Sequence, residues 1–249
     1  MKEMKKKTLV LNSDKKSNLV EDHQHQETSN FSFSNFSSEF DKHINSSIRG
    51  YADLRNDVVS ISKYFVEDET RVMDLGCSQG SLLRAIKSKN HQAKKAEYLG
   101  IDVNDAFAKH WKNEENVTYW VEDVTTMNFP SNLSFITSLF TMQFIPERKR
   151  YNLMKNIHMN LIKGGAFVFA EKFLSNEGKS QNIMDSLYHE FKRQNFTEQE
   201  IMDKERDLRP LMKCSYEHEV IRQLNDIGFK HIQCFWRNFN FAAFYTVKI

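Results

Sequence analysis

The sequence predicts an α/β fold with a mostly parallel sheet that helices cover on both faces. Two observations lead to this prediction: strand-like and helical patterns alternate through the middle of the chain, and its last two strand-like runs have no helix between them. Parallel strands need a crossover connection, usually a helix, so the alternation indicates βαβ units. The predicted strands are 71–75, 97–103, 117–122, 134–140, 165–172, 231–237 and 241–248. We expect the last two to pair antiparallel, which completes a seven-stranded sheet.

Helical patterns separate these strands. The predicted helices are 54–66, 81–89, 104–113 and 147–161. Gly164-Gly165 is typical of a helix end that turns into the next strand. Residues 178–208 are polar and helical without a strand, so we expect a helical insertion before the last strands.

The N-terminal region divides near residue 30. Residues 1–29 are polar with few apolar side chains, which predicts a mobile tail. Apolar residues then recur at spacings of three and four, as on one face of a helix: Phe33, Phe36, Phe40, Ile44 and Ile48. Because this helix precedes the first core strand, we expect 31–51 to form a lid over the sheet edge. Residues 30–249 are then a single domain.

Composition and charge exclude several classes of protein. The 249 residues are 40% hydrophobic, which is enough for one large domain. A net charge of +2, from 35 basic and 33 acidic residues, does not indicate direct nucleic-acid binding. Cys77, Cys214 and Cys234 are far apart and have no zinc-like spacing, which predicts no metal site and a reducing, cytoplasmic location. No apolar run approaches the length of a membrane span, so no membrane contact is predicted.

The most informative stretch is the turn after the first predicted strand, from Asp74 to Gly80. Its sequence is Asp-Leu-Gly-Cys-Ser-Gln-Gly, and a helix follows at once. Glycine turns of this kind let the backbone approach a ligand and aim helix N–H groups at it. Asp102 follows about 20 residues later at the end of the next strand, where a carboxylate suits the hydroxyls of a ribose. The pair predicts a nucleoside cofactor.

The residues of the turn narrow the choice of cofactor. A dinucleotide turn has the pattern G-x-G-x-x-G, whereas this one is Gly76-x-Ser78-x-Gly80 with Asp74 before it. Asp74 would repel a pyrophosphate but could hold a cationic amino-acid group. The arrangement resembles motif I of class I S-adenosylmethionine (SAM) methyltransferases, which have a Rossmann-like fold. The same residues also match the nucleophile elbow G-x-S-x-G, but that motif belongs deep in a hydrolase sheet and here follows the first strand.

Further cofactor contacts are expected where the next strands end. Asp123 could accept hydrogen bonds from the adenine amino group, and Val103 and Val124 could enclose the purine. The alternatives are a strand-end turn residue for Asp123 and core packing for the valines.

A closer resemblance covers about residues 31–249. The blocks that carry it are Gly50-Tyr51, 74–78, 140–144, 164–166, 171–173, 190–193 and 239–241. They are similar to carboxy-S-adenosyl-L-methionine synthases, which make carboxy-SAM from SAM and prephenate for modification of the tRNA wobble uridine. The resemblance implies a class I methyltransferase fold and, because members of the family are often dimeric, a homodimer. It implies that the following residues contact the cofactor: Tyr51, Gly76, Cys77, Ser78, Asp102, Val103, Asp123 and Val124.

Two positions depart from the synthase pattern. Leu139, a further predicted cofactor residue, stands where the family has Asn, and Glu205 stands where it has the Arg that holds the carboxylate of carboxy-SAM. A Glu would repel that group, although Arg206 is next to it and is a candidate catalytic residue together with Tyr51. The alternative for Arg206 is a surface charge.

These departures lead to a methyltransferase as the first hypothesis. Such an enzyme binds SAM and positions an acceptor in line with its electrophilic methyl group, here an unidentified small molecule or a substrate of the tRNA pathway. By resemblance, Gln143 and His189 could also face the acceptor, although a histidine like His189 is more often a helix-surface residue. The alternatives are a carboxy-SAM synthase, with carboxy-SAM as the bound nucleoside, and a SAM-binding subunit without catalysis.

Overall fold

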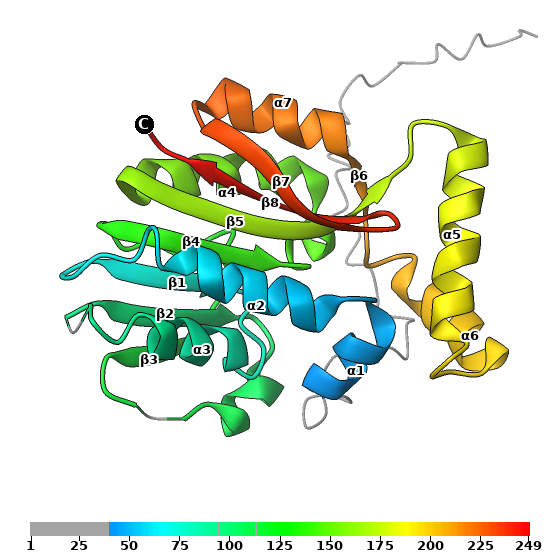
Figure 1. Cartoon of the computed structure of the whole chain (residues 1–249), viewed down its shortest axis with the longest axis horizontal. Helices are drawn as coiled ribbons and strands as arrows, with labels where there is room; N and C mark the ends of the chain where they lie inside the picture. Colours follow the sequence, from blue (N-terminus) through cyan, green and yellow to red (C-terminus); the bar gives the residue numbers. More distant parts are fainter. Residues whose placement is uncertain (1–39, 94, 113) are drawn as a thin grey trace, which may run out of the picture.

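The computed structural model describes residues 40–249 except 94 and 113. The predicted tail 1–29 and the first lid residues, Phe33 and Phe36, lie outside the described residues. An eight-stranded sheet forms the centre (Figure 1). Its strand order is β3 (Val117–Val121), β2 (Glu97–Asp102), β1 (Arg71–Leu75), β4 (Leu133–Leu139), β5 (Leu161–Leu174), β8 (Phe241–Val247) and β7 (Lys230–Asn238), with β6 (Ser215–Tyr216) paired to β5.

The pairing of the strands confirms the predicted sheet. β3, β2, β1, β4 and β5 are parallel, and β8 runs antiparallel between β5 and β7. The two-residue β6 is an addition that the sequence did not predict, because it is too short to show a period.

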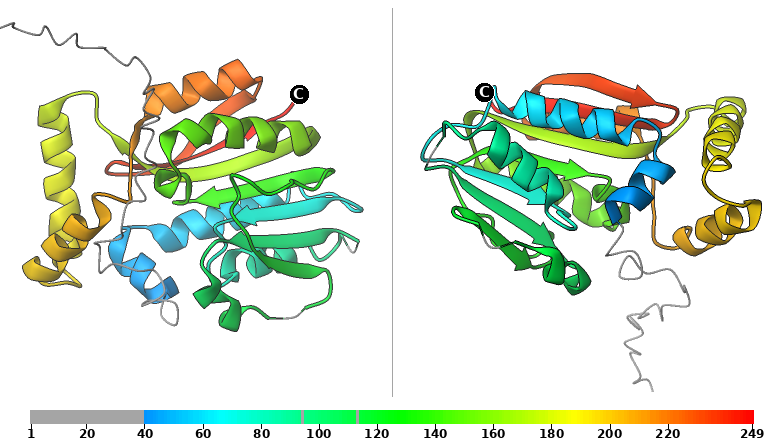
Figure 2. Two further views of the ribbon diagram at one scale, coloured as in Figure 1. Left: turned by 180° about the vertical axis from the view of Figure 1, so that it is seen from behind. Right: turned by 60° about the horizontal axis from the view of Figure 1, so that its bottom comes forward.

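Helices cover both faces of the sheet, as Figures 1 and 2 show. α2 (Tyr51–Ser62) and α3 (Ser81–Lys89) pack on one face, and α4 (Glu147–Asn160) and α7 (Glu217–Ile227) pack on the other. The residues of β1 contribute to a hydrophobic core on each face of the sheet. Val72 packs in the core under α2 and α3, whereas Met73 and Leu75 pack in the core under α4 and α7. This alternation follows from the two-residue period of a strand.

Three helices lie at the end of the sheet where the parallel strands finish. They are α1 (Phe40–Ser47), α5 (Gly178–Lys192) and α6 (Glu198–Leu208), and α5 and α6 form the predicted helical insertion. α6 begins with a capping box, in which Thr197 and Glu200 exchange hydrogen bonds with each other's backbone N–H groups.

The predicted helix 104–113 is wrong. The chain forms only a short 3₁₀ segment, Asp105–His110, before Trp111 turns extended. The side chain of Asn104 accepts a hydrogen bond from the N–H of Ala106 at 3.1 Å, which satisfies the first turn locally. The buried Phe107 then anchors the segment, and no apolar helical face continues beyond it.

Other boundaries move by a few residues. α2 begins at Tyr51 rather than at 54 and ends at Ser62, and β5 begins at Leu161 rather than at 165. Gly164, with φ +84°, lies inside β5 and not at a helix end. The pairing of β5 with β4 is irregular between Leu133 and Phe135. The irregularity that the two glycines predicted therefore lies within the strand.

Candidate active site

A cavity of about 790 Å³ lies between the strand ends, α1 and the helical insertion. This volume lies in the range of small-molecule sites, about 300–1,000 Å³. Most predicted site residues line it. Those at the ends of β1 and β2 are Asp74, Gly76, Cys77, Ser78, Asp102 and Val103. Those on other elements are Tyr51, Asp123, Val124 and Leu139.

The turn after β1 is shaped by close packing. Gly76 and Ser78 have positive φ angles of +76° and +48°. A Cβ on Gly76 would lie 2.2 Å from Oγ1 of Thr141, whose hydroxyl donates to the carbonyl oxygen of Leu75 at 3.0 Å. The glycine therefore lets the chain after β4 cross directly over the turn.

Gly80 is not among the residues that line the cavity. It has φ +71°, and a Cβ there would lie 2.5 Å from the ring of Tyr119 on β3. The same ring would meet a Cβ on Gly100 of β2 at 2.5 Å. Packing against Tyr119 explains both glycines, so the structure gives no support to the predicted cofactor contact of Gly80.

Asp102 holds the turn after β1 in place. Its Oδ2 accepts a hydrogen bond from the N–H of Ser78 at 2.9 Å, and its Oδ1 accepts one from the N–H of Asn104 at 2.9 Å. Burial raises the pKa of Asp102 from its usual value, and these N–H groups oppose the rise. Because a carboxylate oxygen has two lone pairs, both oxygens can still accept ribose hydroxyls.

Asp74 is buried at the floor of the cavity. Burial raises its pKa to about 7, and the charge of Asp102 adds to the rise. The hydroxyl of Thr137 donates to Oδ1 of Asp74 at 2.7 Å and opposes it. A cationic group that binds beside this buried carboxyl is attracted to it, because the positive charge stabilises the ionised form of the carboxyl.

The predicted adenine side is partly occupied by protein contacts. Oδ1 of Asp123 accepts the N–H of Thr125 at 2.8 Å, and Oδ2 lies 3.7 Å from the ammonium of Lys149. Burial slightly opposes ionisation, but these partners lower the pKa of Asp123, which keeps it an acceptor. Val103 is 72% exposed at the cavity whereas Val124 is buried, so Val103 presents a free apolar surface.

A buried network positions the loop after β4. Glu171 of β5 accepts the N–H groups of Met142 and Gln143 at 3.0 and 2.9 Å. The side-chain oxygen of Gln143 in turn accepts the N–H of Lys172 at 2.9 Å. Gln143 therefore reaches the cavity from a loop with little freedom, and Leu139 reaches it from the end of β4.

Arg150 supports the same loop from α4. Its guanidinium donates to the carbonyl oxygens of Ile145 at 2.8 Å and Lys213 at 2.6 Å, and to the hydroxyl of Ser215 at 2.8 Å. It is buried, so the basic run at 148–150 contains a structural residue and does not form one exposed patch.

Comparison with known proteins decides the family. The family model described as a methyltransferase domain matches residues 72–165. Carboxy-S-adenosyl-L-methionine synthase of Staphylococcus epidermidis is 34% identical over 214 residues, which cover 84% of this chain and 92% of that protein. The protein of the same name from Shewanella halifaxensis is 28% identical over 219 residues, with 84% and 88% covered. The chain belongs to the carboxy-S-adenosyl-L-methionine synthase family.

Solved structures support the fold. A Haloferax volcanii protein described as a putative methyltransferase, in complex with the activator Trm112, matches with a TM-score of 0.60 at 14% identity and covers 86% of this chain and 96% of that one. Human N-acetylserotonin methyltransferase in complex with SAM matches at 0.53 and 16%, with 78% and 51% covered. The fold is that of class I SAM methyltransferases.

This protein is a SAM-dependent transferase, with SAM as its cofactor or substrate. The site fits SAM: the turn residues Gly76, Cys77 and Ser78 line the cavity, Asp102 has acceptor capacity, and Asp74 suits a cation. No helix in the described part of the chain is long and apolar enough to cross a membrane. Among residues 40–249, apart from the two gaps, no cluster of His, Cys, Asp and Glu could hold a metal ion.

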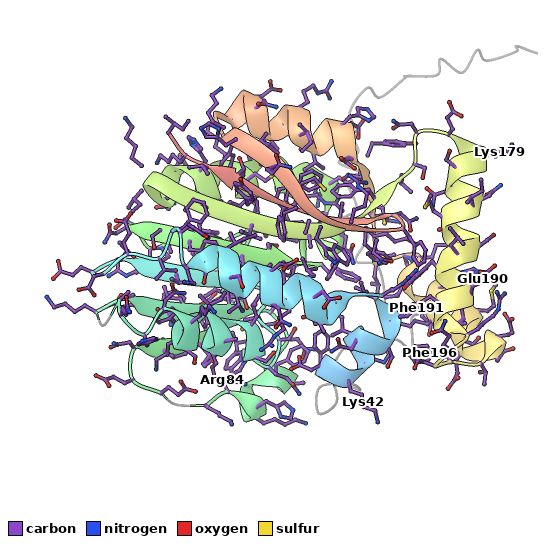
Figure 3. All side chains as sticks on the ribbon, viewed as in Figure 1. Lys42, Arg84, Lys179, Glu190, Phe191 and Phe196 are labelled. Atoms are coloured by element: carbon purple, nitrogen blue, oxygen red, sulfur yellow. The ribbon has the colours of Figure 1, made fainter. Side chains whose placement is uncertain are left out.

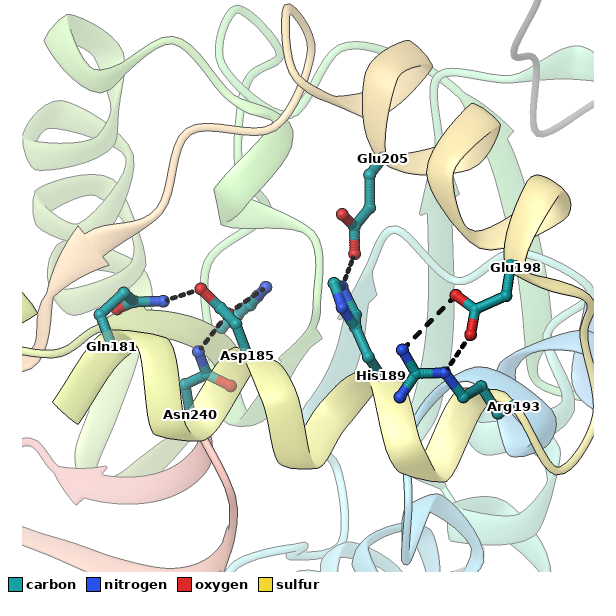
Figure 4. Close-up of polar contacts among 8 residues, drawn as sticks. Gln181, Asp185, His189, Arg193, Glu198, Glu205 and Asn240 are labelled. Carbon is teal, nitrogen blue, oxygen red and sulfur yellow. Dashed lines mark hydrogen bonds and ion pairs between the residues drawn. The ribbon is translucent and has the colours of Figure 1, made fainter. Parts of the chain in front are cut away.

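The structure places Glu205 and Arg206 of α6 on different sides of the helix. Glu205 lines the cavity, where its Oε1 lies 2.5 Å from Nε2 of His189 (Figure 4). Arg206 does not line the cavity; its side chain is 68% exposed and pairs with Asp203 at 2.8 Å and Asp207 at 3.4 Å. The candidate catalytic role of Arg206 is therefore not supported, and the surface-charge alternative describes it.

Two alternatives were open for His189: by resemblance it could face the acceptor, or it could be a helix-surface residue. The structure places it in the cavity lining, beside Glu205.

Sequence analysis missed several lysines that line the insertion side of the cavity. Lys172 lies on β5, Lys192 on α5 and Lys204 on α6. The signal for Lys192 was its spacing of four residues from Tyr188, which places both side chains on one face of the helix.

Proposed function

We propose that this protein makes carboxy-SAM from SAM and prephenate, as the family name of its relatives suggests. The observation that carries the proposal is the charge layout of the cavity. Acidic residues lie at the strand ends, where a cationic cofactor fits, and lysines lie on the insertion side, where an acidic second substrate fits. The resemblance further implies that the product serves modification of the tRNA wobble uridine, without direct contact between this chain and nucleic acid.

Each residue at the strand ends has a defined task in this proposal. Bound SAM supplies a sulfonium that activates its methyl group. Asp74 attracts the cationic amino-acid part, and Asp102 accepts hydrogen bonds from the ribose hydroxyls. Val103 and Val124 enclose the purine, and Asp123 accepts the hydrogens of its amino group.

Tyr51 lines the cavity at the start of α2, and its ring packs against that of Phe140 at 6.2 Å between centres. Burial raises the pKa of its hydroxyl well above the usual value, so Tyr51 remains a neutral hydrogen-bond donor. Its task in the proposal is to orient the cofactor and not to remove a proton.

Methyl transfer to an unidentified acceptor is the second candidate. Leu139 favours it, because this side chain replaces the family's Asn at the cavity wall and offers no hydrogen bond. Glu205 favours it too, because it faces the cavity where the family has a cation. A SAM-binding subunit without turnover would retain the same strand-end residues.

Mass spectrometry of the purified protein separates these candidates. Native spectra report any bound nucleoside, and denaturing spectra identify it; incubation with SAM and prephenate then tests turnover. The proposal expects a SAM derivative heavier by one carboxylate. Plain SAM or its demethylated product, with no carboxylated derivative after prephenate is added, would contradict it. Asp102→Ala is the binding-deficient control, since it removes the ribose acceptor and the support of the turn.

A further inference from the structure

Lys192 carries a buried charge with no acidic partner. Its side chain is only 3% exposed, yet within the described residues its ammonium makes no hydrogen bond or ion pair. The ammonium lies over the ring of Tyr188, whose centre is 5.2 Å from Nζ. Burial lowers the pKa of Lys192, Glu205 opposes this, and Lys172 adds to it. Lys192 lines the cavity, so an ammonium without an acidic partner there is suited to bind the anionic group of a ligand.

A second ammonium lies at the same aromatic ring. Nζ of Lys172 is 5.0 Å from the ring centre of Tyr188 and 6.0 Å from that of Phe241. Its ion pair with Asp185 is long, at 3.6 Å, and Asp185 also accepts hydrogen bonds from Gln181 at 2.9 Å and Asn240 at 3.3 Å (Figure 4). Asp185 is therefore shared among three donors and neutralises Lys172 incompletely.

The acids nearby do not neutralise Lys192 directly. The carboxylate of Glu205 is directed at His189, and Arg206 points to solvent. Lys204, across the cavity on α6, contacts His43 and Ser47 of α1, and the charge of Lys192 helps to lower the pKa of Lys204. The insertion side therefore has more cationic than anionic groups around Lys192.

Aromatic rings extend from this cationic group towards the strand ends. Tyr188 packs against Phe241 at 5.2 Å between ring centres, Phe241 against Phe140 at 5.8 Å, and Phe140 against Tyr51 at 6.2 Å. All four rings line the cavity. A ligand with an acid group at Lys192 would thus place an apolar body along these rings, pointing to the SAM site. This favours a carboxylate on an apolar body over a compact, strongly hydrated phosphate.

We propose that Lys192, supported by Lys172, binds the carboxylate of the second substrate. This proposal rests on the proposed function for the identity of that substrate, but the anion site itself does not depend on it. Glu205 is compatible with the site because its carboxylate contacts His189 and not Lys192.

The test measures thermal unfolding of the full chain with increasing phenylacetate, both without SAM and with saturating SAM. Phenylacetamide, which has the same shape and no charge, is the ligand control, and inorganic phosphate is the second anion. Lys192→Met is compared with Lys192→Arg and with Lys179→Met. Lys179 is exposed at the other end of α5 and does not line the cavity (Figure 3). Lys192→Gln replaces the Met variant if the latter does not fold.

We expect phenylacetate, and not phenylacetamide, to raise the unfolding temperature of the wild type and of Lys179→Met. Lys192→Met should bind phenylacetate about 10- to 100-fold more weakly, the range for a charge-assisted contact, and Lys192→Arg should restore most of the affinity. In turnover, Lys192→Met should raise KM for prephenate by a similar factor and change kcat little.

Several results would overturn the proposal. The first is that the wild type and Lys192→Met bind phenylacetate equally well. The second is that the wild type binds phenylacetamide as well as phenylacetate, and the third is that only phosphate raises the unfolding temperature. The fourth is that the response to phenylacetate is lost when SAM is present. The last would show that the site takes the carboxylate of SAM itself. A Lys192-dependent response to phenylacetate without formation of carboxy-SAM would refute the proposed function and leave the anion site intact.

Discussion

At the scale of single residues, the site depends on close approaches that larger side chains would block. Gly76 admits Thr141, and Gly80 and Gly100 admit Tyr119. The sequence predicted the glycine turn but assigned all of its glycines to the ligand. It could not distinguish a glycine that faces a cofactor from one that faces a tyrosine on another strand, because that depends on the side chain of a residue far away in the chain.

Gly80→Ala is expected to cost more stability than Gly164→Ala. Both positions have a left-handed φ, which destabilises the fold by roughly 1–2 kcal/mol when the residue has a Cβ. Only at Gly80 does the added Cβ also meet a ring, because nothing lies within 4 Å at Gly164. Urea unfolding measures the two losses. Tyr119→Leu should reduce the excess cost of Gly80→Ala, and equal costs for both alanine variants would contradict this account.

Asp74 is expected to make SAM binding depend on pH. Its pKa of about 7 leaves it largely protonated at pH 6 and ionised at pH 8, and the ionised form attracts the cofactor. SAM affinity should therefore rise by up to about tenfold between these values. Titration calorimetry at pH 6, 7 and 8 checks this. Asp74→Asn should flatten the profile, whereas Asp53→Asn, at an exposed position on α2, should leave it unchanged; a pH-dependent Asp74→Asn profile would argue against the role of Asp74.

At the scale of elements, the loop after β4 shows how the site is held. Glu171 binds two of its N–H groups, and Arg150 binds carbonyl oxygens at its end and near β6. Within the basic run 148–150 Arg148 is exposed and Arg150 is buried, because consecutive residues of a helix face different directions, and the sequence does not state which one is buried. The helix expected at 104–113 is also shorter than predicted: Asn104 caps its start, but the chain becomes extended at Trp111 after only six residues of 3₁₀ helix.

Arg150→Met should lower the free energy of unfolding by about 3 kcal/mol or more, since several buried acceptors would lose their donor. Arg148→Met, its exposed neighbour, should change it by less than about 0.5 kcal/mol. Denaturant unfolding of both variants is the measurement. Similar small losses would mean that water replaces the guanidinium at no cost.

At the scale of the whole molecule, the strand order brings the ends of the five parallel strands to one cavity, and α1, α5 and α6 lie on its other side. The α5–α6 insertion lies beyond the sheet and supplies the cationic side (Figure 1). A homodimer stays a prediction from the family resemblance. Light scattering of the purified chain would compare its mass with the 29.4 kDa of one copy.

Two buried carboxyls should make global stability fall as pH rises. Burial raises the pKa of Asp74 from 3.8 to about 7 and that of Glu171 from 4.5 to about 8. Between about pH 4 and 8 the unfolded chain releases these protons while the folded chain retains them, so rising pH favours unfolding. The stabilising effect of each proton is complete below the unfolded pKa and lost above the folded one.

Thermal unfolding at pH 5 and pH 8 checks this expectation. The wild type should lose more stability over that interval than Asp74→Asn or Glu171→Gln, because an amide stays neutral throughout. At pH 8, Asp74→Asn should be more stable than the wild type while binding SAM more weakly. Equal losses in all three proteins would show that these carboxyls are ionised in the folded state.

The sequence by itself determined the fold class and the strand-end side of the site. Strand and helix periods and the turn at 74–78 are local patterns, and parallel strands bring their carboxyl ends to one edge. Asp102 was identified in this way and lies where it was expected.

Only the tertiary structure decided which residues form the insertion side. Adjacent residues of a helix point about 100° apart, so a shift of one position decides between Glu205 at the cavity and Arg206 in solvent. Packing settles that rotation, and it also buries Lys192 beside a ring from its own helix and a lysine from β5. Such contacts join distant parts of the chain, and no local pattern specifies them.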